Sequence, residues 1–231
     1  MKTLGLIGGM SWESTAEYYR LLNELTRDRL GGLHSARLVL YSVDFAAIEQ
    51  LQAAGRWEEA GAVLADAARS LEAAGAELLL ICTNTMHKVA DQVAAAVTVP
   101  LLHLADATAD AVRAAGLRRI GLLGTAFTME QEFYRGRLAA CGLDVLVPDA
   151  ASRTLVHRVI YEELCLGVVR EESRAAYRQV IEELVAAGAE GIVLGCTEIE
   201  LLVRPQDSPV PVFPTARLHA EAAVAAALAG D

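Results

Sequence analysis

The sequence predicts an α/β protein of two pseudo-symmetric lobes, each a parallel sheet flanked by helices. Short aliphatic runs alternate with helical segments along the chain, which is typical of parallel strands joined by right-handed crossovers. The chain also repeats itself: AGAELLLICTNT from Ala74 resembles AGAEGIVLGCTE from Ala187, and TLGLIGGMSWEST from Thr3 resembles RIGLLGTAFTMEQ from Arg119. We therefore expect equivalent strand ends to meet across a cleft that holds the active site.

The repeat also indicates which residues correspond. Aligning the shared AGAE at an offset of 188 − 75 = 113 places Thr83 on Cys196 and Cys82 on Gly195. Pairing the two CT dipeptides instead would need an insertion inside a strand, which would turn every following side chain to the other face. We therefore take Thr83, and not Cys82, as the counterpart of Cys196.

The first half predicts four strands, each ending at a turn or a helix-capping residue. These strands are expected over residues 3–8, 36–45, 77–83 and 99–106. The first helix opens at Ser11 or Glu13 and stops at Gly31-Gly32. Further helical segments follow, interrupted near Gly55, resuming over 57–74, and capped by Asn84-Thr85 through about residue 95.

The second half repeats this order. Strands are expected over 119–124, 143–147, 190–196 and 210–214, and helices over 128–141, 152–166, 171–187 and from Thr215 onward. The predicted first lobe spans residues 1–98 and the second 99–211, and the C-terminal helix, 212–231, is expected to pack back on the first lobe.

Composition narrows the range of functions. A formal net charge of −10 argues against a nucleic-acid partner, because such a surface repels phosphates. No apolar run reaches the roughly 18 residues that would span a membrane. Four cysteines without a regular spacing predict neither a disulfide framework nor a metal site. The opening MKTLGLIGGMSWE shows no cleavage site and is interpreted as a strand, so a reduced cytoplasmic enzyme is expected.

Cys196 is the best candidate for chemistry. It follows a glycine at the end of a buried strand, and ligands of open α/β sheets bind outside the carboxyl ends of strands. Thr197 and Glu198 then open a helix, whose N-terminus is expected to lower the pKa of the thiol. The alternative is a small buried apolar residue.

Other candidates allow two interpretations. Gly8-Gly9-Met10 lacks the spacing of a dinucleotide or phosphate loop, and is either a tight turn or a substrate-facing loop. Thr83-Asn84-Thr85 is either a capping cluster or a set of donors for a substrate carboxylate. His87 could be a base or a hydrogen-bonding support. The remaining cysteines, Cys82, Cys141 and Cys165, are interpreted as packing residues.

These motifs give the chain a resemblance to the cofactor-independent aspartate/glutamate racemase superfamily over nearly its whole length. The matching residues are GGM at Gly8, the NT-x-H block at Asn84 and GCTE at Gly195. Within the superfamily the chain looks most like the L-aspartate/glutamate-specific, broad-specificity amino-acid racemases. That branch is indicated by GGMSWEST, SVDF, CTNTMHKVAD, EELCLG and GCTEIELL.

The resemblance implies proton transfer at an amino-acid α-carbon by one residue from each lobe, with no cofactor. The family usually places a cysteine directly before the NT-x-H block; here that residue is Thr83, opposite Cys196 as the base. Implied substrate contacts are Met10, Gln52, Thr85, Thr125, Thr197 and Glu198. Where aspartate racemases carry a substrate-binding lysine, YEELCLG has Cys165.

Two alternatives differ in chemistry. Related enzymes with one active cysteine decarboxylate substituted malonates or isomerise maleate, and a two-lobed small-molecule binding protein would need no catalytic thiol. The expected partner is an amino-acid substrate, and a homodimer is the oligomer that the resemblance allows.

Overall fold

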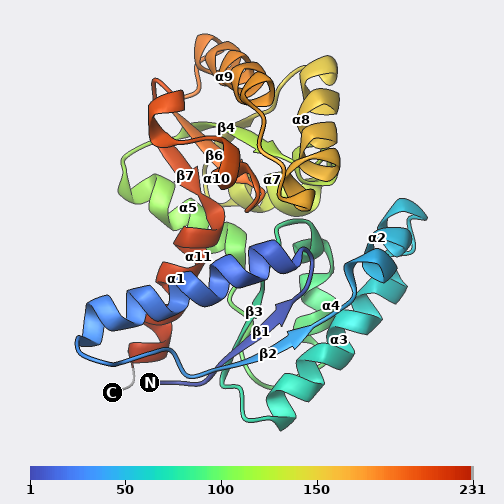
Figure 1. Cartoon of the computed structure of the whole chain (residues 1–231), viewed down its shortest axis with the longest axis vertical. Helices are drawn as coiled ribbons and strands as arrows, with labels where there is room; N and C mark the ends of the chain where they lie inside the picture. Colours follow the sequence, from blue (N-terminus) through green and yellow to red (C-terminus); the bar gives the residue numbers. More distant parts are fainter. Residues whose placement is uncertain (230–231) are drawn as a thin grey trace. The chain divides into compact units, whose positions relative to one another are not determined.

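The computed structural model describes residues 1–229 as two units, each built around its own parallel sheet (Figure 1). One unit holds Met1–Leu104 and the chain from His219 onward, and the other holds Ala105–Leu218. The boundaries expected from the sequence, after residues 98 and 211, lie a few residues before these. The last two residues of the predicted segment 212–231 lie outside the described part of the chain.

The first sheet has the order β2-β1-β3, with all strands parallel. Its strands are β1 (Leu4–Gly8), β2 (Leu38–Ser42) and β3 (Leu78–Ile81). The helices of this unit are α1 (Trp12–Leu30), α2 (Phe45–Ala53), α3 (Trp57–Ala73), the 3-10 turn η1 (Thr85–Val89) and α4 (Ala90–Ala94). Helices α1 and α3 cover opposite faces, since a Cβ at Gly8 would meet Thr15 of α1 and one at Gly5 would meet Leu71 of α3.

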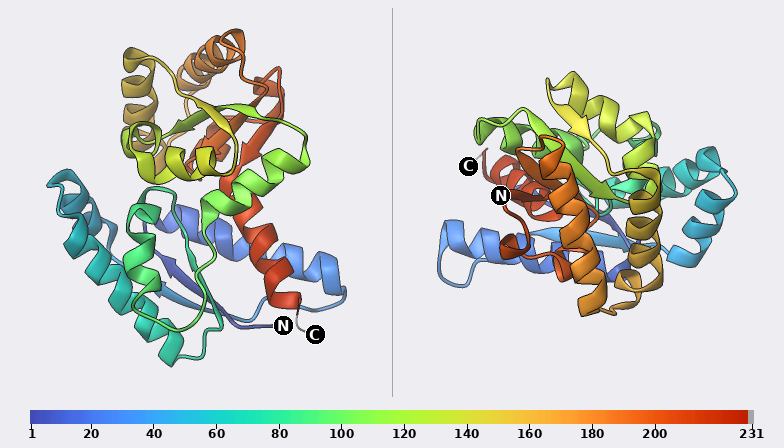
Figure 2. Two further views of the ribbon diagram at one scale, coloured as in Figure 1. Left: turned by 180° about the vertical axis from the view of Figure 1, so that it is seen from behind. Right: turned by 90° about the horizontal axis from the view of Figure 1, so that it is seen from above.

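The second sheet is parallel with the order β5-β4-β6-β7. Its strands are β4 (Arg119–Gly124), β5 (Asp144–Leu146), β6 (Gly191–Gly195) and β7 (Val212–Pro214). The helices and 3-10 turns of this unit in order are α5 (Leu104–Ala114), α6 (Ala126–Glu130), α7 (Glu132–Ala140), α8 (Ala150–Glu162), η2 (Leu164–Leu166), α9 (Glu171–Ala186), α10 (Ile199–Leu202) and η3 (Pro205–Asp207). Helix α11 (Thr215–Leu228) begins in this unit and, from His219, belongs to the first. Apolar residues of α8 and α9 form one core with those of β6, and Figure 2 shows this sheet and its helices from two further sides. Over residues 1–229, no helix combines the length and apolarity needed to cross a bilayer.

One predicted strand is wrong. Residues 99–106 make only a single bridge to the first sheet, at Leu101 opposite Leu79, because α5 begins at Leu104. The predicted strand 36–45 is shorter than expected, since Asp44 already caps α2 with its side chain. The predicted helix 128–141 is divided at Gln131 into α6 and α7.

The internal repeat is present in the strand register. Leu79 of β3 pairs with Gly5 and donates its N–H to Pro100 O at 2.9 Å. Ile192 of β6 pairs with Gly121 and donates its N–H to Pro211 O, also at 2.9 Å. The two residues are 192 − 79 = 113 positions apart, which is the offset of the sequence repeat. Counting onward at this register places Thr83 at the position of Cys196.

The repeated AGAE has a structural reason. Glu77 accepts the N–H of Thr3 at 2.7 Å, and Glu190 accepts the N–H of Arg119 at 2.9 Å. Each glutamate thereby binds the start of the neighbouring strand, β1 or β4, while its own backbone begins the next strand. The same local sequence therefore sets the same strand pairing in both units.

Candidate functional site

The carboxyl ends of β4 and β6 carry the candidate residues of the second unit. Gly124 pairs with Gly195, so Thr125 and Cys196 come directly after paired strand ends. A Cβ on Gly195 would lie 2.9 Å from the carbonyl oxygen of Leu123, which explains why a glycine precedes the cysteine. Cys196 thus lies at the carboxyl end of this sheet, where the sequence predicted a site.

Cys196 is paired with a carboxylate. Its Sγ donates to Oε2 of Glu198 at 2.9 Å, and both residues are buried. The other oxygen of the same carboxylate, Oε1, lies 3.9 Å from Sγ of Cys165, at the edge of a weak hydrogen bond to sulfur. Cys165, interpreted from the sequence as a packing residue, thus belongs to the surroundings of the candidate thiol.

The expected lowering of the Cys196 pKa is wrong. Burial raises the pKa of this thiol well above its ordinary value, and the negative charge of Glu198 raises it further. The helix after it, α10, is a single turn, too short to oppose these two effects. Cys196 is therefore a neutral thiol at rest, with a proton acceptor already in contact.

Two threonine hydroxyls lie near the same strand ends. Thr125 caps α6, accepting the N–H of Thr128 at 3.3 Å, as a capping threonine should. Thr197 is 5% exposed, and within residues 1–229 its hydroxyl oxygen has no hydrogen-bond partner. A buried hydroxyl without a partner costs free energy, so Thr197 is available to bind a polar ligand group.

In the first unit, Thr83 and Cys82 have different surroundings. Cys82 is fully buried and its thiol pKa is raised by burial, whereas Thr83 is partly exposed beyond the end of β3. This agrees with the register that equates Thr83 with Cys196. Cys82 lies where a packing residue is expected.

The side chain of His87 forms a hydrogen bond to the backbone of Thr83. Its Nδ1 lies 2.7 Å from the carbonyl oxygen of Thr83, and its Nε2 accepts the N–H of Leu104 at 3.2 Å. Because Nε2 accepts, the proton of the neutral ring must be on Nδ1, and His87 donates to Thr83. The sequence left His87 undecided between base and support. The spacing could have indicated the supporting role, because a side chain four residues after Thr83 can reach back to its carbonyl oxygen.

The other first-unit candidates are buried together around η1. Gln52 of α2 donates its Nε2 to Sδ of Met86 at 3.0 Å, and Met10 belongs to the same apolar cluster as Met86. Asn84 and Thr85 are also buried, at the start of η1. The predicted cap by Asn84 is wrong, because its side chain makes no capping hydrogen bond.

A second histidine in this unit is held neutral. The Tyr18 hydroxyl lies 2.8 Å from Nδ1 of His219, and Nε2 of His219 lies 3.0 Å from the carbonyl oxygen of Leu102. A carbonyl can only accept, so Nε2 carries the proton and Nδ1 accepts from Tyr18. Burial, with a smaller effect from His87, lowers the pKa of His219 to about 3.

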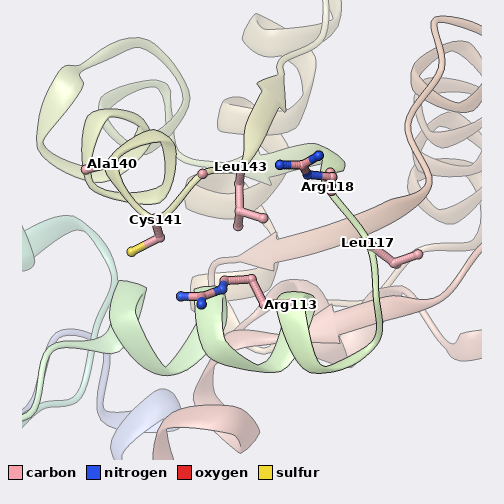
Figure 3. A pocket seen from close by; sticks show the side chains of 7 residues that line it. Arg113, Leu117, Arg118, Ala140, Cys141 and Leu143 are labelled. Atoms are coloured by element: carbon pink, nitrogen blue, oxygen red, sulfur yellow. The ribbon is translucent and has the colours of Figure 1, made fainter.

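A separate hollow of about 400 Å³ lies at the amino-terminal ends of the strands of the second sheet, beside the starts of β4 and β5. Figure 3 shows Arg113, Arg118, Cys141 and Leu143 around it. None of the candidate residues lines this hollow. Within residues 1–229, no group of three or more His, Cys, Asp or Glu residues has an arrangement that could hold a metal ion.

Two parallel sheets of three and four strands, each flanked by helices, match the fold of two-lobed racemases. The chain belongs to the Asp/Glu/hydantoin racemase family, whose model matches residues 7–223.

Solved structures and a named relative are similar to this chain. A structure from Yersinia pestis, described as a proposed Asp/Glu racemase, is 59% identical and superimposes with a TM-score of 0.92 over 99% of this chain and all of its own. An aspartate racemase homologue from Pyrococcus horikoshii is 36% identical, with a TM-score of 0.86 over 98% of this chain and 99% of its own. The broad-specificity amino-acid racemase RacX of Bacillus subtilis is 20% identical, with 98% of each chain aligned.

Proposed function

We propose that this protein racemises amino acids without a cofactor, with L-aspartate, L-glutamate or a related amino acid as substrate. The observation that carries this proposal is the contact between the Cys196 thiol and the Glu198 carboxylate, 2.9 Å apart in a buried environment. A thiol touching a proton acceptor is the arrangement that activates a cysteine. Family membership supplies the reaction class.

The chemistry starts from the neutral thiol. Glu198 takes the proton of Cys196, and the resulting thiolate removes the α-proton of the L-enantiomer. Because burial raises the pKa of Cys196, the thiolate is a strong base once formed, which suits a weakly acidic C–H bond. Thr83 then gives its hydroxyl proton to the other face of the carbanion. The turnover closes when Thr83 regains a proton from solvent and Glu198 releases one.

The remaining candidates bind the substrate in this scheme. Thr197 offers a buried hydroxyl, and Thr125 sits beside Cys196 at the paired strand ends. From the first unit, Asn84 and Thr85 offer polar groups to the substrate, and Met10 and Gln52 shape the apolar surroundings of η1. Hydrogen bonds to the substrate carboxylate stabilise the charge that develops during proton removal.

The test is the exchange of the substrate α-hydrogen with deuterated solvent, followed by mass spectrometry over a panel of L-amino acids. Wild type is expected to incorporate deuterium and to form the D-enantiomer. Cys196→Ala should do neither, while Cys82→Ala serves as the matched control and should keep both activities. Exchange and turnover in Cys196→Ala equal to wild type would refute the mechanism. Carbon dioxide release from a substituted malonate, without exchange on any amino acid, would instead identify a decarboxylase.

A further inference from the structure

The hollow beside the starts of β4 and β5 is lined by two arginines and, among the described residues, by no acidic side chain. Its other walls are apolar or small residues, among them Leu117 and Leu143. In a chain with 30 acidic and 20 basic residues, a hollow whose charged side chains are all cationic is a local exception to the overall charge. Figure 3 shows Arg113 on α5 and Arg118 on the segment before β4, both beside this space. The hollow therefore offers positive charge to a ligand.

Neither of these arginines is neutralised by a close carboxylate. Arg113 lies 4.0 Å from Asp110, one turn earlier on α5, which is too far for a hydrogen bond. Within residues 1–229 the side chain of Arg118 forms no ion pair, because Glu190 accepts the backbone N–H of Arg118 at 2.9 Å instead. The pKa of Glu190 is lowered chiefly by hydrogen bonds from the backbones of Arg119 and Arg118, and least by the charge of Arg118. Both guanidinium groups therefore keep donors for a ligand.

The arginines are not needed to cap the two helices that end beside the hollow. Cationic side chains often bind the free carbonyl groups at a helix C-terminus. Here the backbone closes both ends: the N–H of Gly116 donates to Arg113 O after α5, and the N–H of Gly142 donates to Ala139 O after α7, each at 2.9 Å. Both glycines have the positive φ of such a closure, 75° and 86°. Capping therefore does not explain why two arginines line the hollow.

We propose that this hollow binds a small anion that carries a carboxylate or phosphate group, held by the guanidinium groups of Arg113 and Arg118. A guanidinium presents a planar fork of N–H donors that matches both kinds of group. The backbone of each arginine is fixed, Arg113 in the last turn of α5 and Arg118 by its hydrogen bond to Glu190, so binding needs little ordering. The volume of about 400 Å³ admits a ligand of metabolite size. This inference is independent of the proposed catalytic function.

Cys141 supplies a reporter for the test, because its partly buried thiol lines the same hollow. The protein is reacted with the dianionic disulfide of thionitrobenzoate and, separately, with the uncharged disulfide of thiopyridine. In each reaction the thiol displaces one aromatic thiol and forms a mixed disulfide, and peptide mass spectrometry follows Cys141 alone. The ratio of the two rates cancels the intrinsic reactivity of the thiol, and it reports how strongly the hollow attracts an anion.

Arg113→Gln and Arg118→Gln should each lower this ratio by about fivefold, the effect of one unit-charge contact in water. Asp110→Asn removes the carboxylate that competes for Arg113 and should raise the ratio. Arg29→Gln is the matched control: it removes an exposed positive charge of α1, in the other unit, and should leave the ratio unchanged. Circular dichroism establishes that all variants are folded. A ratio that is the same in wild type and in both lining variants would overturn the proposal.

Protection of Cys141 by added anions tests binding itself. Inorganic phosphate and succinate, in separate arms, should slow the reaction of Cys141 with the uncharged disulfide in wild type, and Arg118→Gln should need about tenfold more anion for the same protection. Protection at the lower concentration by phosphate identifies a phosphate ligand, and by succinate a carboxylate ligand. Sodium chloride at equal ionic strength is the control for screening. Protection by both anions no greater than that by sodium chloride would overturn the proposal.

Discussion

The Sγ of Cys196 lies 2.9 Å from Oε2 of Glu198, only two residues further along the chain. The turn after β6 folds these side chains back on one another, and burial keeps water from competing for the thiol proton. In the proposed mechanism the cysteine supplies the base and the glutamate accepts its proton.

Glu198→Gln should lower kcat for racemisation by about 10²- to 10⁴-fold, the usual contribution of a general base. The glutamine amide has nearly the same size as the glutamate carboxylate. It carries no negative charge, however, and cannot take the thiol proton. Glu198→Asp is the matched comparison, since it keeps the carboxylate and should recover part of the rate. The measurement is the change in circular dichroism of L-aspartate with time. A Gln variant as active as wild type would mean that Glu198 binds substrate only.

Cys82→Ala should leave turnover almost unchanged and should lower the free energy of unfolding by about 1 kcal/mol, because it removes one buried atom from a packed site. Urea titrations of wild type and variant give the stability, and the circular dichroism assay gives kcat. Cys141→Ala, at the less buried end of α7, is a control with a smaller expected cost. Activity lost at Cys82 on the scale of Cys196 would show that Cys82 is the first-lobe acid.

Stability should fall in mild acid because of His219. Its pKa is about 3 in the folded state and about 6.5 in an unfolded chain, so the unfolded state binds the extra proton first. The stabilising contribution is complete above pH 6.5 and is lost as the pH falls toward 3, at about 1.4 kcal/mol per pH unit. His219→Gln can keep both hydrogen bonds without titrating, and should show a shallower decline between pH 6 and pH 4 in urea titrations. Equal slopes for both proteins would contradict a neutral buried His219.

Much of the fold could be predicted from the sequence, because burial and repetition leave strong signals. The AGAE repeat predicted the strand correspondence, and Glu77 and Glu190 show why: each binds the start of the neighbouring strand. The strand predicted over residues 99–106 is wrong, because an apolar run that leads into a helix has the same sequence pattern as a buried strand. Only tertiary contacts decide that a single residue, Leu101, bridges to the sheet.

The candidate site was less accessible to sequence reasoning. Position after a strand indicated Cys196, but the direction of its pKa shift depends first on how deeply the thiol is buried and then on where the Glu198 side chain turns. A helix N-terminus was expected to dominate, and α10 proved too short. The contact of Cys165 with Glu198 joins segments 33 residues apart, and the signal for Cys165 was its place in YEELCLG, where related racemases carry a substrate-binding lysine.

The last expectation concerns Thr83. A threonine hydroxyl can return a proton but is a poor base, so wild type should turn over the D-enantiomer slowly at saturation. Free D- and L-enantiomers have equal free energy, so the two kcat/KM values must be equal, and a low D-to-L kcat must come with a correspondingly low KM. Thr83→Cys places a thiol at the position equivalent to Cys196 and should raise the D-to-L kcat. Circular dichroism started from each enantiomer, in wild type, Thr83→Cys and Cys82→Ala, measures both directions. If Thr83→Cys leaves D-to-L turnover unchanged while Cys82→Ala suppresses it, Cys82 performs the proton transfer and the register argued from Leu79 and Ile192 does not extend to the catalytic residue.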